Sequence, residues 1–342
     1  MTTPPLSHAT SWGRMYGRHI GDTPRVPSIT TVQGMEPELE DPGAKIPLVG
    51  VKPHGGALIA WRARLVQDAT VAYLRNDHET LQADFPHVLT AVDHARQRGR
   101  SRDGVGRAAR DAIAATPDVV AQQAAERGDR VHNFAEAIGN WQTGVGGRAD
   151  VDACRIELDA HGENGYAETL VDWWMRWGVE AVDNEATVWN HQTAVAGTLD
   201  IVFRIEGRLF VGDFKTKSDR GGFAKPMQAK VGMQLVNALH ADERIVDAET
   251  GAWAPWSYGR PDGLVAIAVS PTEVVPKAIN PQTWEALWAK FTHLRQVWQD
   301  YRDVDMGRVL QSVRPPSSAA QWPDDVRAEL PAAWTAGSVL AV

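Results

Sequence analysis

The sequence predicts an α/β fold with a mixed sheet, and two observations support this class. After a largely helical first part, strand-like and helix-like stretches follow in the order three strands, helix, strand, helix. Apolar residues recur every three to four positions in the helix-like stretches, whereas the strand-like ones are short runs rich in β-branched residues. Elements in this order pack as helices against a sheet.

The first part of the chain is predicted to be irregular and then helical. Residues 1–26 are rich in Pro, Gly, Ser and Thr, which favours an irregular arm. Apolar residues at helical spacing predict helices over 57–74 and 89–115, and Pro117 is expected to open another helix that reaches Trp141.

The second part has sharper boundaries. Gly178 ends a predicted helix over 166–178, and Asn280 is the expected N-cap of an amphipathic helix over 280–301. A pattern rich in Pro and Ser after Gly307 predicts a flexible tail. The remaining predicted elements are strands over 185–189, 197–205, 208–216 and 263–269, and a helix over 224–241.

Bulk properties exclude several classes of protein. A chain of 342 residues with 43% hydrophobic content can form one large domain or two small ones, and a net charge of -8 excludes a uniformly basic coat. Cys154 is the single cysteine, so neither a disulfide framework nor a cysteine-ligated metal cluster is expected. Without a signal peptide or a long apolar run, we expect a soluble cytoplasmic protein with no membrane partner.

Three ionisable residues interrupt two strands that otherwise consist of apolar residues. If Glu206-Gly207 forms a two-residue hairpin turn, opposing residues have numbers that sum to 413, and Asp200 faces Asp213. Lys215 lies two positions beyond Asp213 and therefore shares its face. The register decides this prediction, because a slip of one residue would separate the two aspartates.

Two close carboxylates in a partly dry site repel each other unless a cation lies between them. Oxygen ligands of this kind suit Mg²⁺ or Mn²⁺, and such an ion polarises a phosphoryl oxygen. The neighbouring lysine is suited to orienting a water molecule or stabilising charge on a phosphate. The alternative is a surface hairpin that carries an ordinary Asp–Lys ion pair.

The sequence "GTLD", followed after a short hairpin by "DFK", resembles the PD-(D/E)XK nuclease superfamily, specifically its RecB-like exonuclease branch. The matching residues are Gly197, Asp200, Asp213 and Lys215, and Leu199 stands where the family name has proline. The resemblance covers roughly residues 27–300.

Upstream motifs extend the resemblance. "GDRVHNFAEAI" is similar to the Gly-x-x-x-His motif of the branch, which makes His132 an expected metal ligand, and Glu185 resembles a glutamate on the strand before "GTLD". Glu185 is either a metal ligand, a residue that fixes Lys215, or an edge-strand glutamate. Glu136, one helical turn after His132, is either an acceptor that supports the ligand or an exposed glutamate, and the second reading is favoured.

The downstream motif departs from the family pattern. Gln234 in "MQLVNAL" resembles the glutamine of Gln-x-x-x-Tyr, but Ala238 occupies the tyrosine position. Gln228 is a competing candidate for the same role in contacting DNA. This departure puts the DNA-positioning role of the helix in doubt.

The resemblance implies a three-layer, restriction-endonuclease-like core with a mixed central sheet flanked by helices. One or two Mg²⁺ or Mn²⁺ ions would be held by His132, Asp200, Asp213 and the carbonyl of Phe214. Catalysis would use these aspartates together with Lys215 and Glu185, and a single cysteine excludes the iron–sulfur cluster of some relatives. The implied domains are an arm (1–26), a mostly helical region packed on the core (27–125), the nuclease core (126–305) and a flexible tail (306–342).

The implied function is that of a metal-dependent DNA exonuclease in phage or bacterial recombination or repair. DNA is the expected partner, with a recombination or single-strand-binding protein as a further candidate. The basic stretch 215–225 is expected to follow phosphates through Lys217, Arg220 and Lys225, whereas the arginine-rich stretch 95–110 fits a solvated face equally well. The alternative function is a nuclease fold that binds DNA ends or recruits a partner without cleaving DNA.

Overall fold

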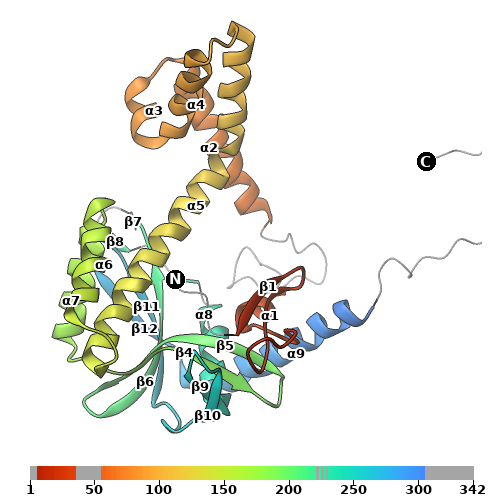
Figure 1. Ribbon diagram of the computed structural model, residues 1–342, viewed down its shortest axis with the longest axis vertical. Helices are drawn as coiled ribbons and strands as arrows, with labels where there is room; N and C mark the ends of the chain where they lie inside the picture. Colours follow the sequence, from red (N-terminus) through yellow and green to blue (C-terminus); the bar gives the residue numbers. More distant parts are fainter. Residues whose placement is uncertain (1–5, 36–54, 221–222, 225–226, 229, 305–342) are drawn as a thin grey trace, which may run out of the picture. The chain divides into compact units, whose positions relative to one another are not determined.

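A computed structural model describes residues 6–35, 55–220, 223–224, 227–228 and 230–304 of the chain (Figure 1). The chain divides into two compact units, Met1–Gln299 and Asp300–Val342, and the fold described below belongs to the first. The predicted tail over 306–342 lies outside the described residues. Within the described part of the chain, no helix is long and apolar enough to cross a membrane.

A seven-stranded mixed sheet forms the centre of the first unit, in the order β10-β9-β4-β5-β6-β11-β12. Only β6 and β11 pair in parallel, and the other neighbours are antiparallel. The strands are β4 (Glu180–Asn190), β5 (Val195–Ile205), β6 (Arg208–Thr216), β9 (Glu243–Asp247), β10 (Ala252–Pro255), β11 (Gly263–Val269) and β12 (Val274–Ala278).

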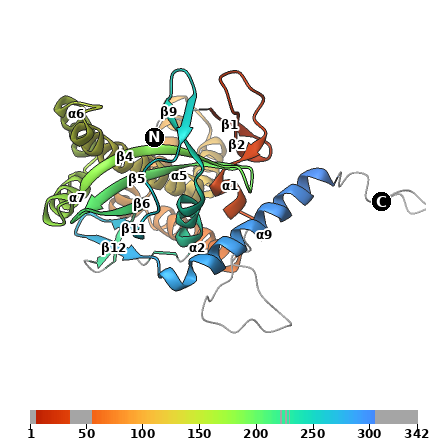
Figure 2. The same cartoon turned by 90° about the horizontal axis from the view of Figure 1, so that it is seen from below.

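Helices cover both faces of this sheet, which confirms the predicted α/β class with a mixed sheet flanked by helices (Figure 2). One face packs against α5 (Arg102–Thr143), α6 (Arg148–Ala160) and α7 (Asn164–Arg176). We call this interior the α5 core; its members include Val131, Phe134, Leu170, Trp173, Ile201, Phe203, Phe214 and Ile267.

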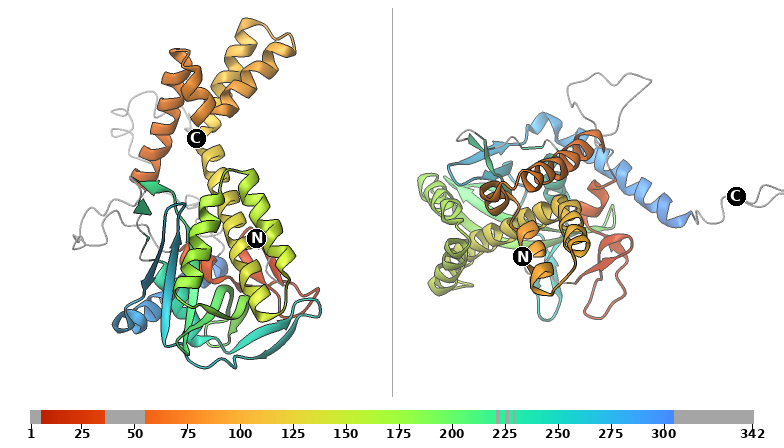
Figure 3. Two further views of the ribbon diagram at one scale, coloured as in Figure 1. Left: turned by 90° about the vertical axis from the view of Figure 1, so that its left-hand side faces the viewer. Right: turned by 90° about the horizontal axis from the view of Figure 1, so that it is seen from above.

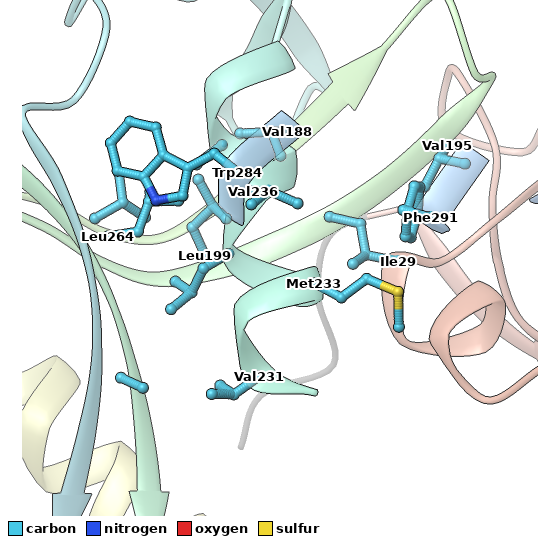
Figure 4. Close-up of a cluster of buried hydrophobic side chains, with 14 of the residues drawn as sticks. Ile29, Val188, Val195, Leu199, Val231, Met233, Val236, Leu264, Trp284 and Phe291 are labelled. Atoms are coloured by element: carbon cyan, nitrogen blue, oxygen red, sulfur yellow. The ribbon is translucent and has the colours of Figure 1, made fainter. Parts of the chain in front are cut away.

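The opposite face packs against α1 (Ile29–Gln33), α8 (Val231–Leu235), the 3-10 helix η1 (Val236–His240) and α9 (Trp284–Asp303). Figure 4 shows side chains of this interior, the α8 core, converging from helices and strands. Its members include Ile29, Val188, Leu199, Val211, Met233, Leu264, Trp284 and Phe291. The helix predicted over 280–301 is confirmed from Trp284, after the short 3-10 helix η2 (Pro281–Thr283) that Asn280 caps through Gln282 N.

The helix predicted over 224–241 is shorter than expected. Residues 223–224 form strand β8, which pairs with β7 (Asp219–Arg220), and α8 starts only at Val231. After Leu235 the chain tightens into η1. Gly232 and the β-branched Val231 and Val236 are poor helix formers, which accounts for the short α-helical stretch.

The helices before the sheet also differ from the prediction. Helix α4 (Pro86–Gln97) stops at a loop with Gly99 at φ +64°, and α5 then runs unbroken for 42 residues with Pro117 inside it (Figure 3). Pro117 is buried, and the neighbouring Thr116 contacts His87 on α4 at 3.0 Å. Tertiary packing therefore holds the helix together at a residue that normally starts or breaks one. Helices α2 (Gly55–Leu74) and α3 (His78–Asp84) complete this helical region.

The segment predicted as an irregular arm contains a small three-stranded sheet instead. Its strands are β1 (Ser7–Thr10), β2 (Gly13–Tyr16) and β3 (Val26–Pro27). The Arg18 guanidinium lies over the rings of Trp189 and Trp253, at 5.1 and 4.7 Å from their centroids. The Trp298 indole donates to the Trp12 carbonyl. Because partners far along the chain order this segment, its local composition did not reveal it.

Candidate metal centre

The hairpin between β5 and β6 has the predicted register. Glu206 and Gly207 have φ values of +52° and +76°, as a type I′ turn requires. The ladder runs from the pair Ile205–Arg208 to the pair Ile201–Gly212, and every pair sums to 413. The next positions in this register are Asp200 and Asp213, where the recorded ladder ends. The turn therefore brings the two aspartates to the same level of the sheet.

The regular strand pattern breaks at Asp200. Leu199 belongs to the α8 core and Ile201 to the α5 core, although residues two apart on a strand normally share a face. On the neighbouring strand, Glu185 has a φ of +47°, and the ladder pairs on either side place it opposite Asp200. A non-glycine residue in the left-handed region is uncommon and costs free energy. Both β4 and β5 thus switch from one face of the sheet to the other at Glu185 and Asp200.

Helix α1 explains the glycine of the "GTLD" stretch. A Cβ atom on Gly197 would overlap the side chain of Ile29, which is buried in the α8 core. The glycine is therefore needed for close approach of the helix to β5, just before the strand reaches Asp200.

Helix α5 places His132 beside Glu185 and Asp200. His132 Nδ1 lies 3.6 Å from Asp200 Oδ2, and one ligand atom each from His132, Glu185 and Asp200 lie within 4.8 Å of one another. The Phe214 ring meets the imidazole edge-on, with the ring centroids 6.2 Å apart. Three residues from a helix and two strands are therefore close enough to share one ion.

Asp213 and Lys215 form the other half of the site. Asp213 is 1% exposed, and its Oδ2 lies 2.6 Å from Lys215 Nζ. Between them, the Phe214 backbone N–H donates to Asp200 Oδ2 over 2.7 Å. The two halves are thus joined through β6, with Asp213 facing the lysine.

Burial shifts the carboxyl groups towards their neutral forms. Desolvation, reinforced by the charge of Asp200, raises the pKa of Glu185 to about 9. The same two causes raise the pKa of Asp213 to about 6, against the opposing effect of Lys215. Desolvation also raises the pKa of Asp200, although Lys215 and the Phe214 N–H act in the other direction. The carboxylates therefore have less positive charge nearby than full ionisation requires.

The two basic residues are shifted in opposite directions. Desolvation, and then the charge of Lys215, lower the pKa of His132 to about 4, so that its imidazole is neutral at pH 7. Desolvation also acts to lower the pKa of Lys215, but the charges of Asp213 and Asp200 outweigh it and the net shift is upward. The site therefore offers a neutral nitrogen ligand beside a lysine that stays charged.

These residues fit a divalent cation. His132 Nδ1 and Asp213 Oδ1 are buried, and neither has a hydrogen-bond partner among the described residues. Buried polar atoms without a partner are uncommon in folded proteins, and a ligand is one explanation for them. A set of carboxylate oxygens and one neutral imidazole suits Mn²⁺ or Mg²⁺.

The geometry adds Glu185 to the ligands that the sequence predicted. Glu185 joins His132 and Asp200, while Asp213 pairs with Lys215 and keeps one oxygen without a partner among the described residues. The ligand role of Asp213 stays a prediction. The ligand role of the Phe214 carbonyl also stays a prediction, and the Phe214 N–H donates to Asp200. The sequence underestimated Glu185 because its position opposite Asp200 depends on the register of a second strand pair, β4–β5.

The predicted DNA-contacting residues lie outside this cluster. Gln228 is exposed and Gln234 is half-buried on α8, and within the described residues neither bonds to the acidic cluster. Lys217 is half-buried, with its backbone N–H donating to Val269 O and its carbonyl accepting from Tyr166. Lys225 and the side chain of Arg220 lie outside the described residues.

Glu136 is a residue whose place the sequence misjudged. It is half-buried one turn after His132, rather than exposed, and burial raises its pKa. Its charge is also among the causes of the raised pKa of Glu185. The spacing of four residues from His132 was the signal that pointed to it.

Comparisons with known proteins add little to this geometry. No family model and no curated protein matches the chain. One solved structure, described as "Crystal structure of SSO0001", is 13% identical over 51% of this chain and 74% of that chain, with a TM-score of 0.25. This likeness is too weak to carry an argument about fold or function.

Proposed function

We propose that the protein is a divalent-metal-dependent deoxyribonuclease with a restriction-endonuclease-like core. The observation that carries the proposal is the cluster of His132, Glu185 and Asp200, with ligand atoms within 4.8 Å of one another, joined through β6 to the buried Asp213–Lys215 pair. Buried carboxylates, a neutral imidazole and a charged lysine are the groups that metal-assisted hydrolysis of a phosphodiester requires.

Each residue has a role that follows from its surroundings. His132, Glu185 and Asp200 would hold Mg²⁺ or Mn²⁺, which when bound supplies the Lewis acidity that polarises a phosphoryl oxygen. Asp213 Oδ2 lies 2.6 Å from Lys215 Nζ and so holds the lysine beside the cluster. The ammonium group then stabilises negative charge on the phosphate or orients the attacking water. The Phe214 N–H fixes one oxygen of Asp200 and so limits its rotation.

Exonuclease action on DNA ends is the preferred version, because "GTLD" and "DFK" resemble the RecB-like branch. The competing version is a nuclease fold that binds DNA ends or recruits a partner without cleaving. Ala238 favours that version: it occupies the tyrosine position of the family motif and is buried in the α8 core.

The decisive experiment uses the purified full chain with linear and circular DNA and a series of Mg²⁺ and Mn²⁺ concentrations. We expect cleavage that EDTA stops and added metal restores, with circular DNA left intact. Asp200→Asn should remove activity, whereas Asp172→Asn, on an exposed carboxylate of α7, should not. Binding without cleavage at any metal concentration would support the non-cleaving module, and cleavage that persists in EDTA would contradict the metal role.

A further inference from the structure

One face of α5 forms a continuous exposed stripe that ends at His132. Its members recur every three or four residues, so on a helix of 3.6 residues per turn they lie on the same side as His132. All are exposed except the last, which is half-buried. The stripe, which we call the α5 track, consists of Arg107, Arg110, Ala114, Asp118, Ala121, Ala125 and Gly128.

Positive charge gathers at the end of the track remote from the site. Arg102, Arg107 and Arg110 line an open depression together with Asp103 and Gly106. None of these three arginines forms an ion pair within the described residues. Three exposed arginines beside one aspartate leave a net positive charge in this depression, which is suited to phosphate groups.

The middle of the track offers little obstruction. Its residues are mostly alanine, and a Cβ atom on Gly128 would meet nothing within 4 Å. The one acidic residue, Asp118, has its charge compensated by Arg62, with Arg62 NH1 2.8 Å from Asp118 Oδ1. Along these middle residues a polyanion therefore meets one acidic side chain, and Arg62 compensates its charge.

The length of the track sets the size of the ligand. Arg110 and His132 are 22 residues apart on one helix, which at a rise of 1.5 Å per residue corresponds to about 33 Å. A strand of B-form DNA advances about 3.4 Å per nucleotide, so this distance corresponds to about ten nucleotides.

We infer that the α5 track binds the sugar–phosphate backbone of the substrate, with Arg107 and Arg110 holding phosphates about ten nucleotides from the metal centre. The inference rests on the proposed function for what happens at the site, but the binding surface itself is carried by the charges and exposure of α5. Because the whole chain has a net charge of -8, its overall charge repels nucleic acid, and local arginines must supply the attraction.

The test is a binding measurement on Arg107→Glu/Arg110→Glu, by fluorescence anisotropy in EDTA so that no cleavage occurs. The probes are labelled DNA oligonucleotides of 30 and 6 nucleotides, single-stranded and as duplexes. We expect affinity for the 30-mers to fall about tenfold or more, and the slope of log K against log salt to decrease by about 2 for the duplex. A 6-mer cannot span the track, so the ratio of long-to-short affinities should fall similarly.

Two further variants separate the track from general charge effects. Arg75→Glu/Arg155→Glu makes the same charge change at two exposed arginines away from the stripe, and we expect its affinity to stay within about twofold of wild type. Ala121→Glu/Ala125→Glu introduces charge into the middle of the track with a good helix former, and we expect it to weaken binding of the 30-mers. Circular dichroism and melting curves establish that each variant is folded.

The outcomes distinguish this inference from the proposed nuclease function. The inferred role of the α5 track is contradicted if Arg107→Glu/Arg110→Glu binds the 30-mers as tightly as the control double variant does. It is also contradicted if the wild type binds no oligonucleotide. Both conclusions hold whatever the cleavage assay shows. If the wild type binds through these arginines but never cleaves, the track stands and the nuclease function fails. If metal-dependent cleavage is found but binding is independent of the arginines, only the track is contradicted.

Discussion

The two ends of α5 lie in opposite surroundings, although they belong to one helix. Towards its C-terminal end, Val131, His132, Phe134 and Ala135 are buried against the sheet, and the helix contributes to the α5 core. Residues 121–126 are all exposed, and nearer the N-terminal end Ile113 packs with α2, α3 and α4 while Thr116 contacts His87 on α4. Burial therefore holds His132 in place at one end of the helix, while exposure leaves the arginine charges available to a ligand at the other end.

The largest expected effect concerns the buried end. Asp213→Ala and Lys215→Ala should each reduce metal-dependent cleavage by about 10²–10⁴-fold, because the variant lacks either the ammonium group or the carboxylate that holds it. Initial rates on linear DNA measure this, with circular dichroism as the check on folding. Near-wild-type rates for either variant would show that the site has been assigned to the wrong residues.

The stability of the two ends should differ as well. Arg130 forms two hydrogen bonds of 2.7 Å to Glu163, and both side chains are nearly buried, whereas the Arg62–Asp118 pair has side chains 42% and 70% exposed. Arg130→Met should lower the free energy of unfolding by about 2 kcal/mol, because it leaves a carboxylate without its partner. Arg62→Met should change it by less than about 0.5 kcal/mol.

Urea denaturation of both variants measures this difference. Equal losses of stability would mean that the nearly buried and the exposed pair contribute alike, contrary to the contrast between the two ends.

Two glycines on α5 provide a matched pair. A Cβ atom on Gly139 would overlap the side-chain amide of Asn184 on β4, whereas the same atom on Gly128 would meet nothing. Gly139→Ala should therefore destabilise the protein by about 1–2 kcal/mol. Gly128→Ala should stabilise it by about 0.5–1 kcal/mol, since alanine loses less backbone entropy in a helix. Melting temperatures that shift in the same direction would contradict this prediction.

The stability of the metal-free protein should also depend on pH. Because the pKa of Glu185 is raised to about 9 in the folded state, the folded protein retains a proton that the unfolded chain loses above pH 4.5. Stability contributed by this group is therefore lost as the pH rises from about 4.5 towards 9. At pH 8, Glu185→Gln should have a higher melting temperature than wild type, by about 2–4 °C for each kcal/mol of unfolding free energy regained. At pH 5, the two proteins should melt at similar temperatures.

Melting curves in EDTA at the two pH values test this, with Glu249→Gln, on an exposed loop residue, as the control. A difference between wild type and Glu185→Gln that is the same at pH 5 and pH 8 would show that ionisation of Glu185 is not its cause.

The sequence predicted those parts of the site that depend on local rules. The period of two along a strand and the glycine at Gly207 were sufficient to set the β5–β6 register and to bring Asp200 near Asp213. Glu185 was harder to predict, because its own backbone has a positive φ that no local sequence pattern indicates. The place of Glu185 beside His132 follows from this break in the strands.

The fold shows the same division between local and distant causes. The apolar run of β11 and the apolar stripe of α9 predicted these two elements, because each element's structure follows from the pattern of its own residues. Pro117 misled the prediction, because packing against α4 keeps α5 continuous there. The β1–β2 hairpin was missed because its contacts come from Trp253 and Trp298.

Those distant contacts have a consequence for the order of events during protein synthesis. Trp12 meets its partner Trp298 across 286 positions of sequence, and Arg18 meets Glu243 across 225. At translation rates of about 5–20 residues per second, the N-terminal strands leave the ribosome roughly 15–60 s before that last partner exists. These strands can therefore dock only long after they are made, once their partners have followed. During that interval their strand edges are open to pairing with other chains.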